Sequence, residues 1–265
     1  MTRPSGTTDL TGTTGELSGR VALVTGGSGG IGAAVCVALA RAGAAVAVNG
    51  TDGERTAATV RRVTDLGGRA LAVVGSVADA GDVERMLRIT VEELGGLHIA
   101  VNNAGLQTAS PFLDLTLEGW RAQLSVDLDG AFLVARGAAA HMVAHGGGVV
   151  VNVTSVHEHQ PRPGYAAYCV AKAGLGMLTQ VMARELTGRG VRTVSVAPGA
   201  VATAVQGGLS VSDQQAQLDG IPAGRLAQPE EVAELIAWVC SPRAAYVSGA
   251  SLVVDGALMT QVSLA

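Results

Sequence analysis

The sequence predicts a doubly wound α/β fold, a seven-stranded parallel sheet with helices on both faces. Short apolar segments rich in β-branched residues alternate with longer segments of helical composition along most of the chain. The apolar segments show little polar alternation, which is typical of strands buried on both faces. Because a helix separates each strand from the next, we expect parallel pairing.

The elements are expected in the following order. Strands are predicted at 20–25, 44–49, 69–74, 98–103, 148–154, 192–197 and 251–255. Helices are predicted at 31–41, 54–66, 79–94, 116–144, 165–187 and 229–240. Residues 1–19, rich in Thr, Gly and Ser, are interpreted as a flexible tail, and residues 20–265 as one domain. Residues 200–224 have weak periodicity and are interpreted as a mobile lid over the site.

Composition excludes several classes of protein. The 265 residues are 48% hydrophobic and 15% charged, enough for a large core, and no run of about 18 uncharged apolar residues predicts a membrane span. The 18 basic residues are scattered and the net charge is −4, which argues against nucleic acid as a partner. Cys36, Cys169 and Cys240 form no CxxC pair, which favours a reducing cytoplasm. No cluster has metal-ligand spacing, so we expect no metal.

A glycine-rich turn follows the first predicted strand. It reads Thr25-Gly-Gly-Ser-Gly-Gly-Ile-Gly32 and opens directly into a helix. Such a turn lets backbone N–H groups approach a pyrophosphate, and the helix N-terminus favours negative charge there. A glycine cluster alone could be a tight turn, but the strand before it and the helix after it favour dinucleotide binding and a Rossmann-like fold.

Tyr168 and Lys172 lie four residues apart in a predicted helix, which places them on one face. A phenol is a poor base at neutral pH, and a nearby ammonium stabilises its phenolate form. Ser155 follows a strand end, where ligands bind in parallel sheets, and its hydroxyl could bind a substrate oxygen. Taken alone, the Tyr168–Lys172 pair favours an ordinary amphipathic helix, but together with Ser155, the glycine-rich turn and Pro198-Gly199 it favours a catalytic pair.

Four motifs together resemble the short-chain dehydrogenase/reductase family. They are TGxxxGxG at 25–32, Asn102-Asn103-Ala104-Gly105, Ser155 thirteen residues before Tyr168-x-x-x-Lys172, and Pro198-Gly199 with Thr203. The resemblance implies an NAD(P)(H)-dependent oxidoreductase that interconverts a secondary alcohol and a ketone. Tyr168 would be the acid/base, Ser155 would bind the substrate, and Lys172 would hold the nicotinamide ribose. The implied cofactor-binding residues are Gly26, Ser28, Gly30, Ile31, Gly50, Thr51, Asn103, Ala104, Gly105, Tyr168, Lys172, Pro198, Gly199 and Thr203.

The chain departs from the family pattern in places. Asp127 stands where the family has an Asn that helps to hold a proton-relaying water, so we count Asp127 as a catalytic candidate that could equally be structural. Ser76 stands where an Asp usually holds the adenine. Gly50 stands where an acidic residue would bind a ribose hydroxyl, so that residue is missing here. Thr51 and Gly29 stand where a basic residue would bind a 2′-phosphate, so that residue is missing as well. These changes predict use of both cofactors, with NADP(H) slightly favoured over NAD(H).

The substrate is expected to be a small carbonyl or alcohol. The leading hypothesis is an alcohol/ketone oxidoreductase such as a ketoreductase. The second is a sugar dehydrogenase, because the stretch after Ser155 resembles bacterial glucose 1-dehydrogenases, with His157 facing the substrate and Gln107 where those enzymes carry Glu. A third is a non-catalytic dinucleotide-binding protein. The resemblance also implies a homotetramer or homodimer assembled through helices 116–144 and 165–187 and through the final helix and strand.

Overall fold

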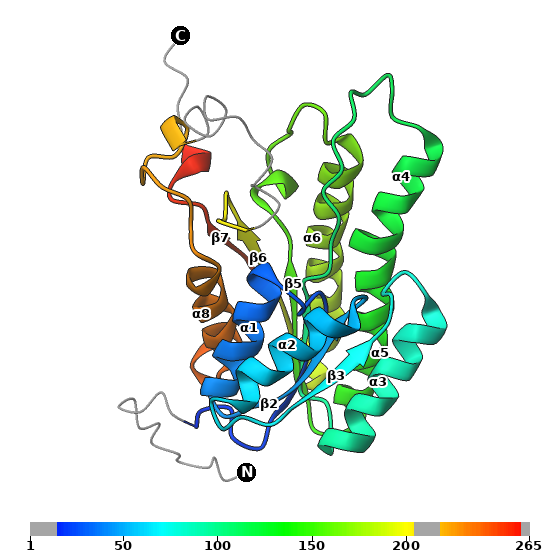
Figure 1. Ribbon diagram of the computed structural model, residues 1–265, viewed down its shortest axis with the longest axis vertical. Coiled ribbons are helices and arrows are strands. Elements are labelled where there is room, and N and C mark those ends of the chain that lie inside the picture. The colour runs from blue at the N-terminus through cyan, green and yellow to red at the C-terminus, as the bar shows by residue number, and fades with distance from the viewer. Residues whose placement is uncertain (1–14, 204–217, 261–265) are drawn as a thin grey trace.

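The computed structural model describes residues 15–203 and 218–260 and contains one seven-stranded parallel sheet (Figure 1). The strand order is β3-β2-β1-β4-β5-β6-β7, with every neighbouring pair parallel. The strands are β1 (Val21–Val24), β2 (Ala45–Gly50), β3 (Ala70–Val74), β4 (Ile99–Asn102), β5 (Gly148–Val153), β6 (Val191–Pro198) and β7 (Ser251–Val254). The predicted fold class is confirmed.

Helices form a layer on each face of the sheet. One layer contains α1 (Gly30–Arg41), α2 (Gly53–Thr64) and α8 (Pro229–Cys240), and α1 packs along α8. The other contains α3 (Ala80–Leu94), α4 (Leu117–Leu124), α5 (Ala131–Ala144) and α6 (Ala166–Leu186). This arrangement directs the loops after the strands to one edge of the sheet.

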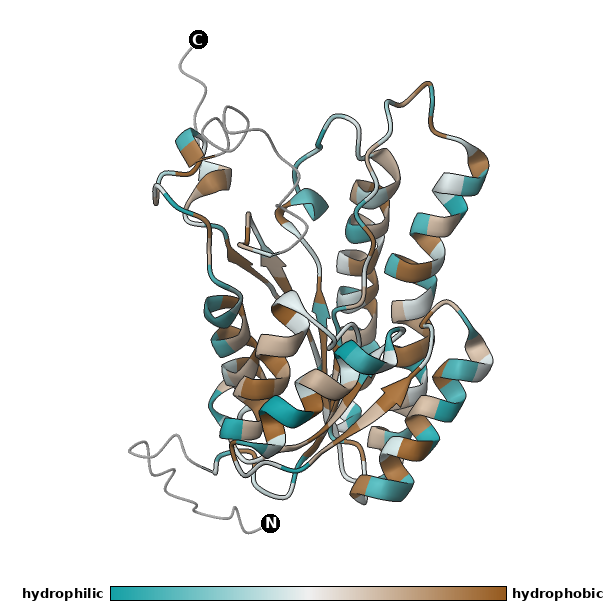
Figure 2. Ribbon diagram, viewed as in Figure 1, coloured by the Kyte–Doolittle hydropathy of each residue, from teal (hydrophilic) through white to brown (hydrophobic). Residues whose placement is uncertain are grey.

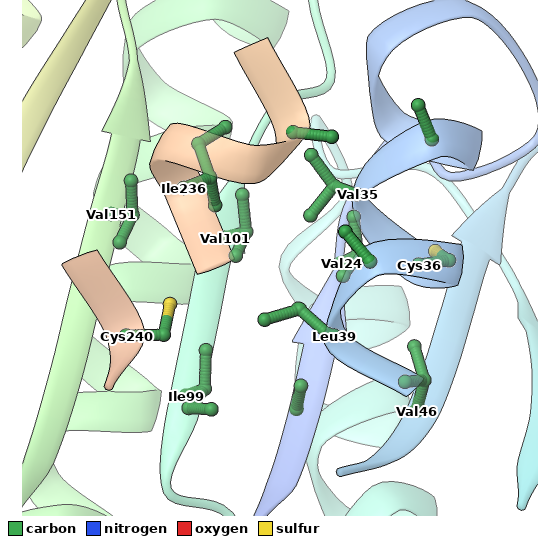
Figure 3. Packing of buried hydrophobic residues seen from close by; sticks show 14 of the residues in the cluster. Val24, Val35, Cys36, Leu39, Val46, Ile99, Val101, Val151, Ile236 and Cys240 are labelled. Carbon is green, nitrogen blue, oxygen red and sulfur yellow. The ribbon is translucent and has the colours of Figure 1, made fainter. Parts of the chain in front are cut away.

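Two hydrophobic cores explain why the strands lack polar alternation. Along β1, Ala22 and Val24 pack under α1 and α8, whereas Val21 and Leu23 face the α3 and α5 layer. Side chains of a strand alternate between faces, so both faces need apolar residues. Figure 2 shows the strands as mostly hydrophobic ribbons, and Figure 3 shows Val35, Leu39 and Ile236 meeting over the sheet.

The N-terminal boundary differs from the prediction. Leu17, assigned to the flexible tail, is only 1% exposed, and its N–H donates to the carbonyl of Ala42 at 2.8 Å. Glu16 forms an ion pair with Arg243 at 3.2 Å. The packed part of the chain therefore includes residues 15–19, because the apolar side chain of Leu17 is buried in an otherwise polar segment. Residues 1–14 of the predicted tail lie outside the described residues.

The predicted helix at 116–144 is not continuous. Between α4 and α5 the chain forms a π-helical turn, Ser125–Gly130, which contains Asp127. Such wide turns inside a helix occur often at functional sites. Of the predicted lid at 200–224, residues 204–217 lie outside the described part of the chain. Across 15–203 and 218–260, no helix has the length and apolar character needed to cross a bilayer.

Candidate active site

Two adjoining cavities lie at the edge of the sheet where the strands end. We call the first, of about 560 Å³, the tyrosine cavity, because Tyr168 lies in its wall. The second, of about 420 Å³, is the glycine cavity, which is bordered by the glycine-rich turn after β1. The two cavities share wall residues, namely Ile31, Asn103, Gly105, Leu106 and Thr203. Both fall within the size range of small-molecule sites, and together they form one cleft.

The structure brings the predicted site residues together in this cleft, with one exception. The tyrosine cavity is lined by Ser155, His157, Tyr168, Lys172, Gln107, Pro198, Gly199 and Thr203. The glycine cavity is lined by Gly26, Ser28, Gly30, Ile31, Gly50, Thr51, Asn103, Ala104 and Gly105. Asp127 lines neither cavity and lies fully buried behind Lys172.

The glycine-rich turn is shaped by close backbone contacts. A Cβ atom at Gly32 would lie 2.2 Å from the carbonyl oxygen of Gly26, and Gly26 itself has a left-handed φ of 63°. The Asn103 amide donates to the carbonyls of Thr25 and Gly26, at 3.0 and 3.2 Å. The first turn of α1 contains no acidic residue. A nucleotide pyrophosphate fits such a glycine cradle at a helix N-terminus.

The far end of the glycine cavity contains a charged residue that sequence reasoning missed. Arg55, in the first turn of α2, is the one charged side chain among the cavity's described wall residues. Its guanidinium occupies the space beside Gly29, where a Cβ atom would lie 2.8 Å from the Arg55 Nη2. The space beside Gly50 is filled, since a Cβ atom there would lie 2.5 Å from Thr56 Oγ1. A search for basic residues in the first turn of the helix that follows β2 would have identified Arg55 in the sequence.

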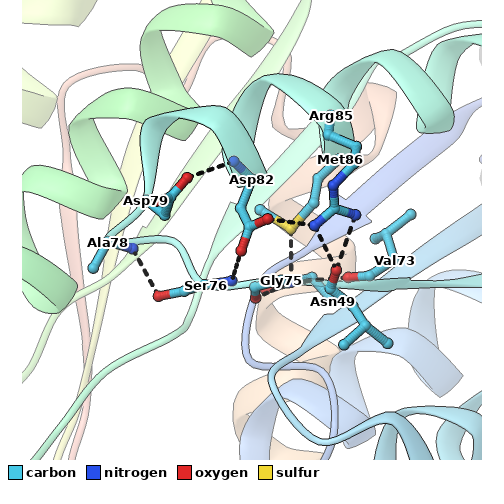
Figure 4. A network of polar contacts seen from close by, with 10 residues as sticks. Asn49, Val73, Gly75, Ser76, Ala78, Asp79, Asp82, Arg85 and Met86 are labelled. Atoms are coloured by element: carbon cyan, nitrogen blue, oxygen red, sulfur yellow. Dashed lines mark hydrogen bonds and ion pairs between the residues drawn. The ribbon is translucent and has the colours of Figure 1, made fainter.

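A polar network holds the loop at 75–79 against this cavity (Figure 4). The Asn49 amide donates to the carbonyls of Val73 and Gly75, each at 3.0 Å. Asp82 accepts the backbone N–H of Ser76 at 2.9 Å and pairs with Arg85. The Ser76 hydrogen bond lowers the pKa of Asp82, followed by the hydrogen bond from Arg85. The backbone of Ser76 is thus held in place by Asp82, although Ser76 lacks the carboxylate that the family pattern has at this position.

Lys172 is buried between Tyr168 and Asp127. Its Nζ lies 5.5 Å from the centre of the Tyr168 ring and donates to the carbonyl of Val153 at 3.2 Å. The Lys172 Nζ lies 3.4 Å from Asp127 Oδ2. Ser155 is also buried, and its Oγ accepts the backbone N–H of His157 at 3.2 Å. The ammonium is therefore positioned to act electrostatically on the phenol.

The π-helical turn holds Asp127 in a fully buried position. Its Oδ1 accepts the backbone N–H of Leu106 at 2.7 Å, in a loop that borders both cavities. Burial raises the pKa of Asp127 above its ordinary value, while the charge of Lys172 and the Leu106 hydrogen bond oppose that rise. Asp127 therefore touches Lys172 and the loop but not the cavity itself.

The loop after Ser155 brings two further side chains to the tyrosine cavity. The His157 ring lies edge-on to Tyr168, with 6.3 Å between ring centres, and its Nδ1 is 3.2 Å from the carbonyl of Gln160. Burial lowers the pKa of His157, which favours the neutral ring. Arg162, which sequence reasoning did not single out, also lines this cavity. No group of three or more His, Cys, Asp or Glu side chains within residues 15–203 and 218–260 is placed to hold a metal ion.

Comparison with known proteins assigns the family. A family model described as Enoyl-(Acyl carrier protein) reductase matches residues 26–258. The oxidoreductase YohF of Escherichia coli is 40% identical over 243 residues, which cover 91% of this chain and 96% of that protein. The chain belongs to the short-chain dehydrogenase/reductase family. Glucose 1-dehydrogenase 2 of Bacillus subtilis is 35% identical, covering 92% of this chain and 96% of that protein.

Solved structures of relatives agree with this assignment. A 7α-hydroxysteroid dehydrogenase in complex with NADH and 7-oxo glycochenodeoxycholic acid is 30% identical, with a TM-score of 0.88 and coverage of 91% and 94%. A gluconate 5-dehydrogenase from Burkholderia cenocepacia in complex with NADP and tartrate is 34% identical, with a TM-score of 0.89 and coverage of 93% and 97%. The predicted family and enzyme class are confirmed: the protein is an NAD(P)-dependent oxidoreductase acting on alcohol and carbonyl groups.

Proposed function

We propose that the chain interconverts a secondary alcohol and a ketone in the tyrosine cavity, with Tyr168 exchanging the hydroxyl proton. The observation that carries this proposal is that Ser155, Tyr168 and Lys172 line one cavity, which shares a wall with the glycine cavity. A bound nicotinamide cofactor supplies or accepts the hydride. The glycine-rich turn and the N-terminus of α1 would hold its pyrophosphate, and Lys172 would hold its nicotinamide ribose.

Each of the three side chains has a separate task in this proposal. When an alcohol is oxidised, the Tyr168 phenolate accepts the hydroxyl proton, and when a ketone is reduced, the Tyr168 phenol returns it. The Lys172 ammonium stabilises the phenolate. The Ser155 hydroxyl donates to the substrate oxygen as negative charge develops there. Burial of Ser155 and Lys172 keeps water from weakening these interactions.

The test is replacement of Tyr168 by Phe, which removes the proton-carrying oxygen and keeps the ring. We expect kcat/KM to fall by about 10³-fold or more, because general acid–base catalysis contributes that order of magnitude. Cofactor affinity, measured by fluorescence titration, should stay within about twofold, since the substitution keeps the ring and leaves Lys172 and the glycine-rich turn unchanged. Tyr246→Phe is the matched control, because Tyr246 is fully exposed on the loop before β7. Retained turnover in Tyr168→Phe would remove the assignment.

We also propose that NADP(H) is favoured over NAD(H). The glycine cavity has no acidic side chain among its described wall residues that would repel a 2′-phosphate. The Arg55 guanidinium stands beside Gly29, where many NADP-using relatives have a basic residue. An arginine near the ribose accommodates the 2′-phosphate of NADP by charge-assisted hydrogen bonds. Arg55 of α2 thus supplies the basic group that Gly29 and Thr51 lack.

A sugar dehydrogenase is the second candidate. His157 and Gln107 both line the tyrosine cavity and could hydrogen-bond a polyol. The similarity to a glucose 1-dehydrogenase favours testing it. Glucose-dependent formation of NADH or NADPH by the purified protein would support this candidate over a ketoreductase.

We further propose a homodimer or homotetramer. Three apolar side chains, Val170, Met177 and Val181, are exposed along one side of α6, and Leu117 is exposed on α4, which packs against α6. Contiguous exposed apolar residues on neighbouring helices are typical of subunit interfaces. Met177→Glu combined with Val181→Glu should therefore yield a smaller species in light scattering. Leu66→Glu, which adds one such charge at an exposed apolar residue after α2, is the control for adding a surface carboxylate.

A further inference from the structure

Arg162 brings an unbalanced positive charge to the wall of the tyrosine cavity. Its guanidinium stacks on the Tyr165 ring at 4.0 Å, and that ring lies edge-on to Tyr168 with 6.5 Å between ring centres. Arg162 is also close enough to His157 for its charge to help lower the pKa of that ring, after the larger effect of burial. The cation is therefore one aromatic ring away from the proposed proton donor.

The loop restrains Arg162 in this position. Pro161 and Pro163 flank it, and the residue before a proline is restricted to extended conformations. The carbonyl of Arg162 accepts the N–H of Tyr165 at 3.1 Å, and the carbonyl of Gly164 accepts the N–H of Ser110 at 2.8 Å. A side chain held by stacking on a restrained loop loses little conformational entropy when it binds a ligand.

The charges around the cavity do not cancel. Among its described wall residues, the side chains with full positive charge are Lys172 and Arg162, and none is an Asp or Glu. Lys172 has a buried counter-charge in Asp127. Arg162 forms no ion pair with any residue in 15–203 or 218–260. A planar guanidinium without a partner, in a half-buried position, is suited to bind a carboxylate through two parallel hydrogen bonds.

We propose that the substrate carries a carboxylate, which Arg162 binds while the ketone or alcohol group reaches Tyr168. The inference rests on the alcohol/ketone function proposed above and specifies its substrate as an oxo- or hydroxycarboxylate. The carboxylate is separated from the reacting carbon by several bonds, because the Tyr165 ring lies between the two protein groups. Arg162 would set substrate specificity and takes no part in the proton transfer.

The test compares acids with their neutral esters. Levulinate and 4-oxocyclohexanecarboxylate, each paired with its methyl ester, are reduced by the full-length wild-type enzyme and by Arg162→Gln. We expect the wild type to prefer the acid, and the acid-to-ester ratio of kcat/KM to fall by about 10- to 100-fold in Arg162→Gln, the loss typical of a charged hydrogen bond. Arg189→Gln, at the opposite end of α6 and with the same change of charge, should leave the ratio unchanged.

A binding measurement separates this inference from the proposed chemistry. In Tyr168→Phe loaded with NADP, the same acids and esters are titrated by calorimetry, where no turnover is needed. Acid binding that weakens on adding Arg162→Gln, with ester binding less affected, supports the inference even if Tyr168 proves not to be the proton donor. Equal effects on acid and ester, or a wild type that prefers the esters, would overturn it.

Discussion

The glycine cavity and the tyrosine cavity are built in different ways. The glycine cavity takes its shape from backbone and from side chains that are missing, as at Gly26 and Gly32, where a Cβ atom would collide with neighbouring main chain. The tyrosine cavity takes its chemistry from side chains on separate segments, with Ser155, Arg162 and Tyr168 meeting across a loop and a helix. The main chain therefore sets the shape of the glycine cavity, whereas side chains set the chemistry of the tyrosine cavity.

The largest effect that would test this contrast is expected at Gly32. Gly32→Ala places a methyl group 2.2 Å from the Gly26 carbonyl, so the turn must move. We expect a loss of about 3 kcal/mol in unfolding free energy, or about 6–12 °C in Tm. Cofactor affinity should fall by about 100-fold, since displacements near 1 Å have effects of this size.

Gly119→Ala is the matched control for Gly32→Ala. Gly119 also lies in a helix, but a methyl group there meets its nearest neighbour, Thr116 Oγ1, at an ordinary 3.4 Å. Gly119→Ala should not lower Tm, because Ala has a higher helix propensity than Gly. Unchanged NADPH titrations and calorimetric melting of Gly32→Ala would show that backbone contact does not shape the glycine cavity.

Arg55 tests whether a side chain also matters at the nucleotide end. Arg55→Gln should weaken NADPH binding by about 10- to 100-fold, because a charge-assisted hydrogen bond to the 2′-phosphate is lost. NADH binding should change by less than about twofold, since NADH lacks that phosphate. Fluorescence titration with both cofactors measures the ratio. Arg61→Gln, exposed in the last turn of the same helix, is the control. Equal losses for the two cofactors would mean that Arg55 does not contact the 2′-phosphate.

The smallest expected effect concerns pH and Asp127. Ionised Asp127 partly offsets the charge of Lys172, so Asp127→Asn leaves the ammonium to stabilise the Tyr168 phenolate unopposed. We expect the acid limb of the pH–kcat profile for alcohol oxidation to move to lower pH. Superimposable profiles would show that the carboxylate has no part in the reaction.

Stability provides an independent measurement on the same pair. Burial raises the pKa of Asp127, so the folded state holds this proton more tightly than the unfolded state. The resulting stability is complete below the ordinary carboxyl pKa and is lost as pH rises through the raised value. An asparagine side chain does not titrate, so Asp127→Asn has no such contribution to lose. As pH rises through this range, the unfolding free energy of the wild type should therefore fall relative to that of Asp127→Asn. Denaturant unfolding at a series of pH values, from acidic to neutral, measures the difference.

Local patterns in the sequence predicted the fold well. All seven strands appear within about one or two residues of their expected bounds, because β-branched runs ending in glycine or polar residues mark strands directly. The break at Ser125–Gly130 could not be predicted this way, since the residues there suit an ordinary helix. The burial of Leu17 was also missed, because one apolar residue in a polar stretch gives no periodic signal.

By itself the sequence determined the order of elements, the family, and the residues that meet at the edge of the sheet. These follow from local spacing, since a turn, a strand end or an i, i+4 pair is encoded within a few neighbouring positions. Only the tertiary structure decided what lies across space from those residues: Arg55 beside Gly29, Asp127 behind Lys172, and Arg162 in the wall that contains Tyr168. Electrostatic contacts of this kind depend on distance between segments, which no local pattern specifies.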